Sequence, residues 1–444
     1  SGALELLKKL LDASPSNVVL LNHQSMLQKK TGHVFDAIKT LEQAVRLDAT
    51  YAASYNHLGL LYHQLHEHEK AEHFFLQALK QQSDYIDAMY NLALTYKVQQ
   101  KMLDASSALM ALLSAASGHL PAHFLLAKIF LSAGKKQKAC ERFAMIADLS
   151  DNAQNVLAEI IALLLADNYF IEAEPFCQLS LKQNPSNATA HYNLGVIYER
   201  MRNINPAITY YQKAIDLKAD YFEALNNIGV LYLEKQQIQT AAFYLKKAMA
   251  LQPENKSLQH TYAAVTGDQS VQSASKEYIS ALFDQYAGHF DEHLQVGLRY
   301  QVPELLAQQL RDRVDVRQAQ WDVLDLGCGT GLAGAAVRPW AKTLTGIDLS
   351  EKMLAQAKKK NLFTALHQDD CVEGLEKYQH FFDLVIAADV FVYWGNVTPL
   401  FQALAKAMKP GGLLSFSIEL TEGNAFCLSP SGRFHHAFAY IQSE

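Results

Sequence analysis

The sequence predicts a chain of two parts: an all-α superhelix of repeated helix pairs, followed by an α/β domain with a Rossmann-like parallel sheet. The first part is predicted by a pattern of small and large residues that recurs every 34 residues up to about residue 266. The second is predicted by a buried-strand pattern at residues 323–326, by the three alternate glycines that follow it, and by the alternation of strand-like and helix-like segments after them.

The 34-residue register is clearest where one unit follows another between residues 191 and 248. Gly195 and Ala207 are small where two helices are expected to cross closely, and Tyr198 and Tyr211 are large enough to fill the space between helix pairs. The matched positions are His191, Leu194, Gly195, Tyr198, Ala207, Tyr211 and Ala214, then Leu225, Ile228, Gly229, Tyr232, Ala241, Leu245 and Ala248.

This period and pattern resemble the tetratricopeptide repeat (TPR). The resemblance implies about seven repeats and a capping helix in residues 1–266, with a concave face that binds a protein or peptide. Asn91, Asn193 and Asn227 occupy one equivalent position, and an asparagine can pair with a peptide backbone because it is both donor and acceptor. They resemble the asparagine ladder of some peptide-binding TPR arrays. Alternatively, asparagine is simply a common polar residue at this position.

Residues 267–276 are small and polar, which predicts a linker. Residues 277–320 are expected to form a helical extension that is rich in aromatic residues near Tyr286, His289 and Phe290.

The segment from Val323 to Gly331 carries the most informative motif. Glycines at alternate positions let a nucleotide-like ligand lie against the end of a strand and the start of the next helix. Asp325 lies inside the motif, which argues against a phosphate ligand and for a cationic one. Asp348 ends the next predicted strand, where a carboxylate can accept both ribose hydroxyls of a nucleoside.

The motif resembles that of class I S-adenosylmethionine-dependent methyltransferases, over residues 277–444. Pro410-Gly411-Gly412 before the fifth predicted strand fits the same family. The resemblance implies S-adenosyl-L-methionine as cofactor, an acid after the third strand near the adenine, small residues after the fourth, and a lid closed over the cofactor. Asp370 with Cys371 is preferred to Asp369 for the acid. The implied cofactor-binding residues are Asp325, Gly327, Cys328, Gly329, Gly331, Asp348, Leu349, Met353, Asp370, Cys371, Ala387 and Tyr286.

Two alternatives accompany this interpretation. Gly329, Gly331 and Gly334 also satisfy the dinucleotide fingerprint, but the acids Asp325 and Asp370 favour the methyltransferase. The aromatic lid residues can instead pack their helix onto the core or onto the last repeat.

Methyl transfer requires mainly that the acceptor is aligned and water is excluded, with a base where a proton must leave. Asp389, Tyr393 and His436 are the candidate catalytic residues, with His436 as a general base. Alternatively, Asp389 caps a turn and His436 packs at a helix N-terminus. Glu419 and Arg433 are candidates near the acceptor, or they pair only with each other. No metal-ligand cluster is expected.

The chain reaches Glu444 inside or just after the helix expected to follow the fifth strand. Because this fold normally has seven strands, the sheet is expected to be cut short after strand five, with its edge continued or covered by another element.

Composition excludes several classes of protein. The net charge is −6, with 39 basic and 45 acidic residues and no long basic run, so nucleic acid is not an expected partner. The five cysteines are scattered, which favours a reducing, cytoplasmic location, and no apolar run is long enough to span a membrane. The predicted function is methylation of a protein or peptide recruited by the repeats. The alternatives are a small-molecule methyltransferase with a docking module and a scaffold that binds the cofactor without turnover.

Overall fold

The computed structural model describes residues 2–287, 290–292, 294, 300–316 and 319–444. The chain forms two compact units, Ser1–Asn203 and Ile204–Glu444. Residues 204–266 therefore belong to the same compact unit as the α/β domain, whereas the sequence pattern predicts a boundary at residue 266.

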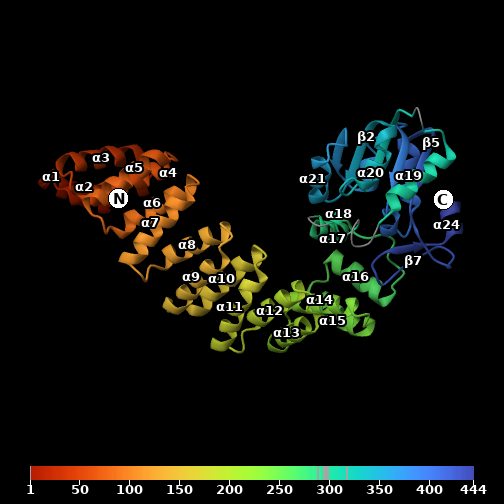
Figure 1. Ribbon diagram of the computed structural model, residues 1–444, viewed down its shortest axis with the longest axis horizontal. Helices are drawn as coiled ribbons and strands as arrows, with labels where there is room; N and C mark the ends of the chain where they lie inside the picture. The colour runs from red at the N-terminus through yellow and green to blue at the C-terminus, as the bar shows by residue number, and fades with distance from the viewer. Residues whose placement is uncertain (1, 288–289, 293, 295–299, 317–318) are drawn as a thin grey trace. The chain divides into compact units, whose positions relative to one another are not determined.

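The first unit consists of helices that pack in successive pairs, each helix against the next (Figure 1). Turns of three residues join the two helices of a pair, and three or four residues join one pair to the next. The helices are α1 (Gly2–Ala13), α2 (Val18–Lys30), α3 (Val34–Leu47), α4 (Ala52–Gln64), α5 (His68–Gln81), α6 (Ile86–Val98), α7 (Met102–Ala115), α8 (Leu120–Ser132), α9 (Lys136–Leu149), α10 (Ala153–Ala166), α11 (Phe170–Gln183) and α12 (Ala188–Arg200).

The helix pairs pack as the small–large pattern predicts. Gly59 of α4 lies against Phe75 of α5, and a Cβ at Gly59 would come within 2.5 Å of the Phe75 ring. Ala71 and Phe75 are fully buried. A small residue is needed at this crossing because the two helices approach closely there.

A second 34-residue periodicity appears in the backbone. One residue in the turn of each helix pair adopts a left-handed conformation with positive φ, and these residues recur at 34-residue intervals as Gly32, His66, Gln100, Gly134, Asn168, Arg202 and Gln236. Among the described residues, seven turns share this conformation.

The second unit begins with helices of the same kind: α13 (Ile204–Leu217), α14 (Phe222–Glu234), α15 (Ile238–Leu251) and α16 (Lys256–Thr266). Helices α17 (Lys276–Tyr286), α18 (Phe290–Glu292) and α19 (Val302–Arg313) then lead to the sheet. Ala207 and Tyr211 are fully buried, as their positions in the repeat predict.

A parallel five-stranded sheet forms the centre of the α/β part, with the order β3-β2-β1-β4-β5. This is the Rossmann-like arrangement predicted from the sequence. The strands are β1 (Trp321–Leu326), β2 (Ala341–Asp348), β3 (Ala365–Gln368), β4 (Phe382–Ala387) and β5 (Met408–Phe416). The connecting helices are α20 (Leu332–Val337), α21 (Glu351–Lys359), α22 (Cys371–Leu375) and α23 (Thr398–Ala407), with 3-10 turns at Arg338–Trp340 and Phe391–Tyr393.

Both faces of the sheet are covered by helices, because the side chains of a strand alternate between its faces. Leu324 of β1 belongs to one core cluster, with Leu400 and Leu404 of α23. Val323 belongs to the other, with Leu306 of α19 and Val337 of α20. A strand buried on both faces is mostly apolar, and residues 323–326 are apolar except for Asp325.

The segment after β5 differs from the expected helix. It forms a small three-stranded sheet of order β6-β8-β7, followed by α24 (Phe438–Ser443). Its strands are β6 (Glu419–Leu420), β7 (Phe426–Leu428) and β8 (Phe434–His436). Residues 434–436 are therefore a strand and not the start of a helix, because they pair with Phe426–Leu428 across a turn at Gly432.

Within the described residues, no helix is both long and apolar enough to cross a membrane.

Candidate cofactor and acceptor site

A cavity of about 270 Å³ lies where the carboxyl ends of β1 to β4 meet in the second unit. This is the edge of a parallel sheet at which ligands bind in open α/β folds. The loops after the strands contribute Gly327, Cys328, Gly329 and Thr330, then Asp348 and Leu349, then Asp370 and Cys371, then Ala388, Asp389, Val390 and Tyr393.

The glycine-rich loop after β1 needs glycine for two physical reasons. Gly327 has φ +65°, and a Cβ there would come within 2.5 Å of Val390. Gly331 has φ +89° and directly precedes α20. A side chain at Gly327 or Gly331 would be strained. Because glycine has no side chain, the backbone itself lines the cavity at Gly327 and Gly329.

Asp325 lies beneath this loop and does not line the cavity. Its side chain is 1% exposed, and its Oδ2 accepts a hydrogen bond from the Gly334 amide at 2.7 Å. No group in the described part of the chain hydrogen-bonds to Oδ1. Burial raises the pKa of this carboxyl to about 8. A buried carboxylate with an unused oxygen favours a nearby cation.

Asp348 ends β2 and lines the cavity. Its two oxygens accept from the amides of Gly329 at 2.7 Å and Ser350 at 2.8 Å. Burial raises the pKa of Asp348, while these backbone hydrogen bonds oppose the shift. The acid after β2 and the glycine loop after β1 are thus held together by a direct hydrogen bond.

Asp370 rather than Asp369 faces the cavity. Asp370 is the N-cap of α22, and its Oδ1 accepts from the amides of Val372 and Glu373. Asp369 forms an ion pair with Lys377 at 2.6 Å. The geometry therefore favours Asp370, with the adjacent Cys371, as the acid at this end of the cavity.

Helix α17 covers the cavity with Ile279, Leu282 and Phe283, and Phe290 follows from α18. The Phe283 ring lies 6.1 Å from Phe290 and 5.7 Å from Tyr393. The side chain of Asp284 hydrogen-bonds to Ser350. The predicted residues Tyr286, by its side chain, and His289 lie outside the part of the chain that the structure describes.

Three other predicted cofactor residues support the cavity from outside it. Gly331 is the N-cap of α20, Met353 is fully buried in α21, and Ala387 is fully buried at the end of β4. The next residue, Ala388, lines the cavity in place of Ala387.

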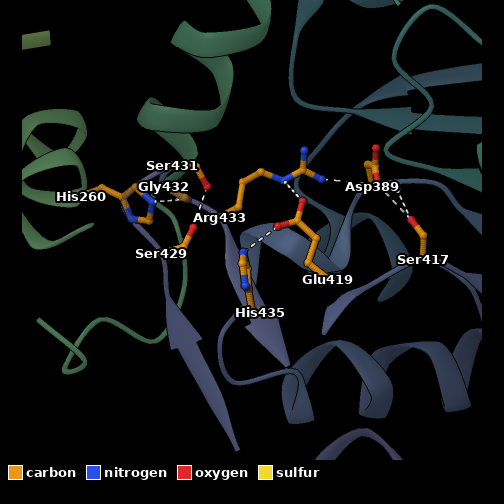
Figure 2. Close-up of polar contacts among 9 residues, drawn as sticks. All are labelled: His260, Asp389, Ser417, Glu419, Ser429, Ser431, Gly432, Arg433 and His435. Carbon is orange, nitrogen blue, oxygen red and sulfur yellow. Dashed lines mark hydrogen bonds and ion pairs between the residues drawn. The ribbon is translucent and has the colours of Figure 1, made fainter. Parts of the chain in front are cut away.

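Asp389 is the centre of a polar cluster at the β4–β5 side of the cavity (Figure 2). Its backbone is left-handed, with φ +57°, which is uncommon for a residue with a side chain and is concentrated at functional sites. Its amide donates to the Ser417 hydroxyl at 2.8 Å, and that hydroxyl donates to Asp389 Oδ1 at 3.1 Å. The Tyr300 hydroxyl also hydrogen-bonds to Asp389, and burial raises the pKa of Tyr300 far above its ordinary value.

Arg433 reaches the cavity from the turn between β7 and β8. Its guanidinium forms ion pairs with Glu419 at 2.8 Å and with Asp389 at 3.4 Å, and His435 Nε2 lies 2.7 Å from the other oxygen of Glu419 (Figure 2). The expected pairing of Glu419 with Arg433 is present. Its extension to Asp389, Tyr300 and Ser417 was not predicted, because the five residues come from distant segments.

The other two candidate catalytic residues lie in different surroundings. Tyr393 lines the cavity, and burial raises the pKa of its hydroxyl. His436 is fully buried in β8 and is not among the lining residues. Its Nε2 lies 2.7 Å from the carbonyl oxygen of Trp394, and burial lowers its pKa. The position of His436 argues against a role as general base.

The three predicted peptide-binding asparagines lie half-buried on the first helices of their pairs. Asn91 donates to Asn56 Oδ1 at 3.0 Å, and Asn227 donates to the Tyr211 hydroxyl at 3.2 Å. Asn193 lies on α12. Asn91 and Asn227 therefore already have partners inside the repeats, which leaves fewer of their polar atoms for a peptide.

Comparison with known families agrees with this architecture. The family described as "Methyltransferase domain" matches residues 323–412. The tetratricopeptide repeat family matches residues 52–85, 188–221 and 222–255.

The curated relatives include methyltransferases. A malonyl-[acyl-carrier protein] O-methyltransferase of Erwinia pyrifoliae is 32% identical over 154 residues, which is 34% of this chain and 55% of the relative. A ubiquinone biosynthesis O-methyltransferase of Idiomarina loihiensis is 35% identical over 99 residues, which is 21% of this chain and 41% of the relative. The chain spans about half the length of the curated relatives it matches.

Solved structures are similar to part of this chain. The crystal structure of MamA is 28% identical, with a TM-score of 0.31 over 33% of this chain and 86% of that one. YrrB, described as a TPR protein with an unusual peptide-binding site, is 20% identical, with a TM-score of 0.32 over 50% of this chain and 97% of that one.

The fold and the site define a helical-repeat protein joined to a Rossmann-like α/β domain. More specifically, the chain combines tetratricopeptide repeats with a class I methyltransferase domain.

Proposed function

We propose that this chain transfers the methyl group of S-adenosylmethionine to a carboxylate oxygen of an acceptor, and that a protein or peptide bound to its repeats presents that acceptor. The observation that carries the proposal is a single cavity lined by the glycine loop, Asp348 and Asp370 at the β2–β3 side and by Asp389 and Arg433 at the β4–β5 side.

The acids at the β2–β3 side of the cavity suit a ligand that carries both an adenosine group and a positive charge. Asp348 would accept hydrogen bonds from ribose hydroxyls, and Asp370 from the adenine amino group. Asp325, when ionised, would add negative charge below the glycine loop, where its buried Oδ1 has no hydrogen-bond partner in the described part of the chain. When bound, S-adenosylmethionine supplies a methyl group already activated on a sulfonium sulfur.

The β4–β5 side of the cavity favours an acceptor that can react without first losing a proton to a base. The described residues that line the cavity include no histidine, and burial raises the pKa of both lining tyrosines, Tyr300 and Tyr393, so their hydroxyls stay protonated. A carboxylate is already ionised at neutral pH and attacks without losing a proton. Arg433, the cation among the lining residues, would orient such a carboxylate by a bidentate contact.

The names of the relatives support this choice in part. Malonyl-[acyl-carrier protein] O-methyltransferase names an acceptor attached to a protein, which agrees with recruitment through repeats. The ubiquinone biosynthesis O-methyltransferases favour a hydroxyl acceptor as the second candidate. For that candidate, Asp389 would have to take the proton.

The test is acceptor-dependent release of S-adenosylhomocysteine, compared for malonyl-acyl carrier protein and for catechol. The proposal predicts turnover of the malonyl thioester and none of its methyl ester, which has no free carboxylate. Turnover of catechol alone would establish the hydroxyl candidate instead. Cofactor binding without turnover of either would support a scaffold that only binds the cofactor.

A further inference from the structure

Helix α16 follows directly after the last matched repeat, residues 222–255, and is built into the α/β part. Ala263 and Ala264 of α16 form a buried cluster with Leu428 and Phe434, which flank the turn between β7 and β8. Figure 1 shows α16 beside β7. Helix α16, which follows the last matched repeat, therefore also packs against the hairpin that carries Arg433.

His260 makes the polar contact of this interface. Its side chain is 3% exposed, and its Nε2 lies 2.9 Å from the carbonyl oxygen of Gly432 (Figure 2). Because burial lowers the pKa of His260, the ring is neutral at pH 7 and Nε2 carries the proton that it donates. The ring also packs 4.3 Å from Tyr278 of α17.

The turn that receives this hydrogen bond has little freedom to move. Gly432 has φ +79°, and a Cβ there would collide with the Tyr278 hydroxyl. The Gly432 amide donates to the Ser429 carbonyl at 2.9 Å, and the Ser429 amide donates to the Arg433 carbonyl at 2.9 Å. Helices α16 and α17 thus fix the residue that directly precedes Arg433.

Arg433 directly follows Gly432 in the sequence. Its guanidinium bridges Glu419 and Asp389 at the cavity. A shift of the turn would change which donors of the guanidinium face an acceptor, and errors of about 1 Å in such positions can cost about a hundredfold in rate.

We propose that His260 is a positioning residue, which holds the Gly432 turn so that Arg433 orients the acceptor; the inference rests on the proposed function for the role of Arg433. It assigns the end of the repeats a part in acceptor selection in addition to recruitment.

The test compares His260→Phe, which keeps a ring but removes the donor, with His260→Gln, whose amide can still donate to the Gly432 carbonyl. His123→Phe is the matched control, because His123 is also a buried histidine, 2% exposed, with Nε2 2.8 Å from a backbone carbonyl, that of Ser117 in the first unit. The 444-residue chain is assayed with malonyl-acyl carrier protein, and S-adenosylhomocysteine affinity is measured by calorimetry.

His260→Phe is expected to raise KM for the malonyl thioester about tenfold, with S-adenosylhomocysteine affinity unchanged, while His260→Gln and His123→Phe stay near the wild type. In an Arg433→Gln background the effect of His260→Phe should disappear, because the two residues act in series. An unchanged KM, or additive effects of His260→Phe and Arg433→Gln, would overturn the inference.

Hydrogen exchange separates this inference from the proposed function. If the wild type does not methylate the malonyl thioester, the acceptor class fails, but exchange at the Ser429 and Gly432 amides still decides the role of His260. Faster exchange in His260→Phe, restored in His260→Gln, supports it, and unchanged exchange contradicts it.

Discussion

The backbone amide of Gly329 donates a 2.7 Å hydrogen bond to Asp348 Oδ2, which joins the glycine loop after β1 to the acid that ends β2. Asp348 therefore holds the loop in place and also lines the cavity. The other Asp348 oxygen accepts from Ser350, whose hydroxyl in turn accepts from the Met353 amide as the N-cap of α21. Met353 thus belongs to the support of the site although it does not line the cavity.

The assignment of Asp370 is tested by comparison with its neighbour. Asp370→Asn removes an anionic acceptor from the cavity but keeps the cap of α22, because asparagine is as good an N-cap as aspartate. We expect S-adenosylmethionine to bind about tenfold more weakly, the loss typical of one charge-assisted hydrogen bond. Asp369→Asn is the control, and calorimetric titration measures both. Equal effects of the two changes would exclude a specific role for Asp370.

The affinity for the cofactor should depend on pH, and this dependence should be larger for a ligand that carries the sulfonium charge. Asp325, with a pKa of about 8, is protonated at pH 6.5 and loses its proton as the pH rises to 8.5. Affinity for cationic S-adenosylmethionine should therefore increase about three- to tenfold over this range. S-adenosylhomocysteine, which lacks the sulfonium charge, should change less, and Asp325→Asn should flatten the S-adenosylmethionine profile. Identical profiles for the two ligands would contradict this electrostatic role.

Arg433 should affect the acceptor and not the cofactor. Arg433→Gln removes the cation among the described lining residues and breaks the ion pairs that Arg433 forms with Asp389 and Glu419. We expect KM for a carboxylate acceptor to rise at least tenfold, with Arg433→Lys intermediate because lysine cannot make a bidentate contact. Steady-state kinetics with malonyl-acyl carrier protein measures the effect, and S-adenosylhomocysteine affinity serves as the internal control. A parallel loss of acceptor methylation and of S-adenosylhomocysteine affinity would indicate a folding defect.

The buried His436 should make the second unit less stable in acid. Burial lowers its folded-state pKa below the ordinary value of about 6.5. Above pH 6.5 the ring is neutral in both states, so the free energy of unfolding is at its full value. As the pH falls below 6.5, the unfolded chain takes up a proton that the folded chain resists, and stability decreases until the pH reaches the lowered pKa.

Tryptophan fluorescence can follow this transition, because all three tryptophans, Trp321, Trp340 and Trp394, lie in the second unit. The urea midpoint should fall between pH 7.5 and 5.5. His436→Gln, which can still donate to the Trp394 carbonyl but does not titrate, should show a smaller fall. His380→Gln changes an exposed histidine and should follow the wild type. A fall of equal size in His436→Gln would assign the acid sensitivity to other groups.

The sequence predicted the features that depend on local pattern. Small residues such as Gly59 recur where helices cross, and an apolar strand before a glycine loop is visible without any knowledge of distant contacts. The left-handed residue of each repeat turn could not be predicted from the sequence. Its φ is similar in every turn, but its identity changes, as His66, Gln100 and Arg202 show.

The acceptor side of the cavity could not be predicted in the same way. Tyr300, Asp389, Ser417 and Arg433 belong to four separate segments, and only the fold brings them together. Residues 434–436 were expected at a helix start because a single short segment contains no sign of the partner strand, whereas pairing with β7 makes them a strand.

Titration of S-adenosylmethionine into the 444-residue chain and into Asp348→Asn tests the central claim most directly, with Asp369→Asn as a control. The account predicts micromolar binding, about −8 kcal/mol, that is lost or weakened at least tenfold in Asp348→Asn and kept in Asp369→Asn. Absence of binding to the wild-type chain, or equal binding by Asp348→Asn, would contradict it.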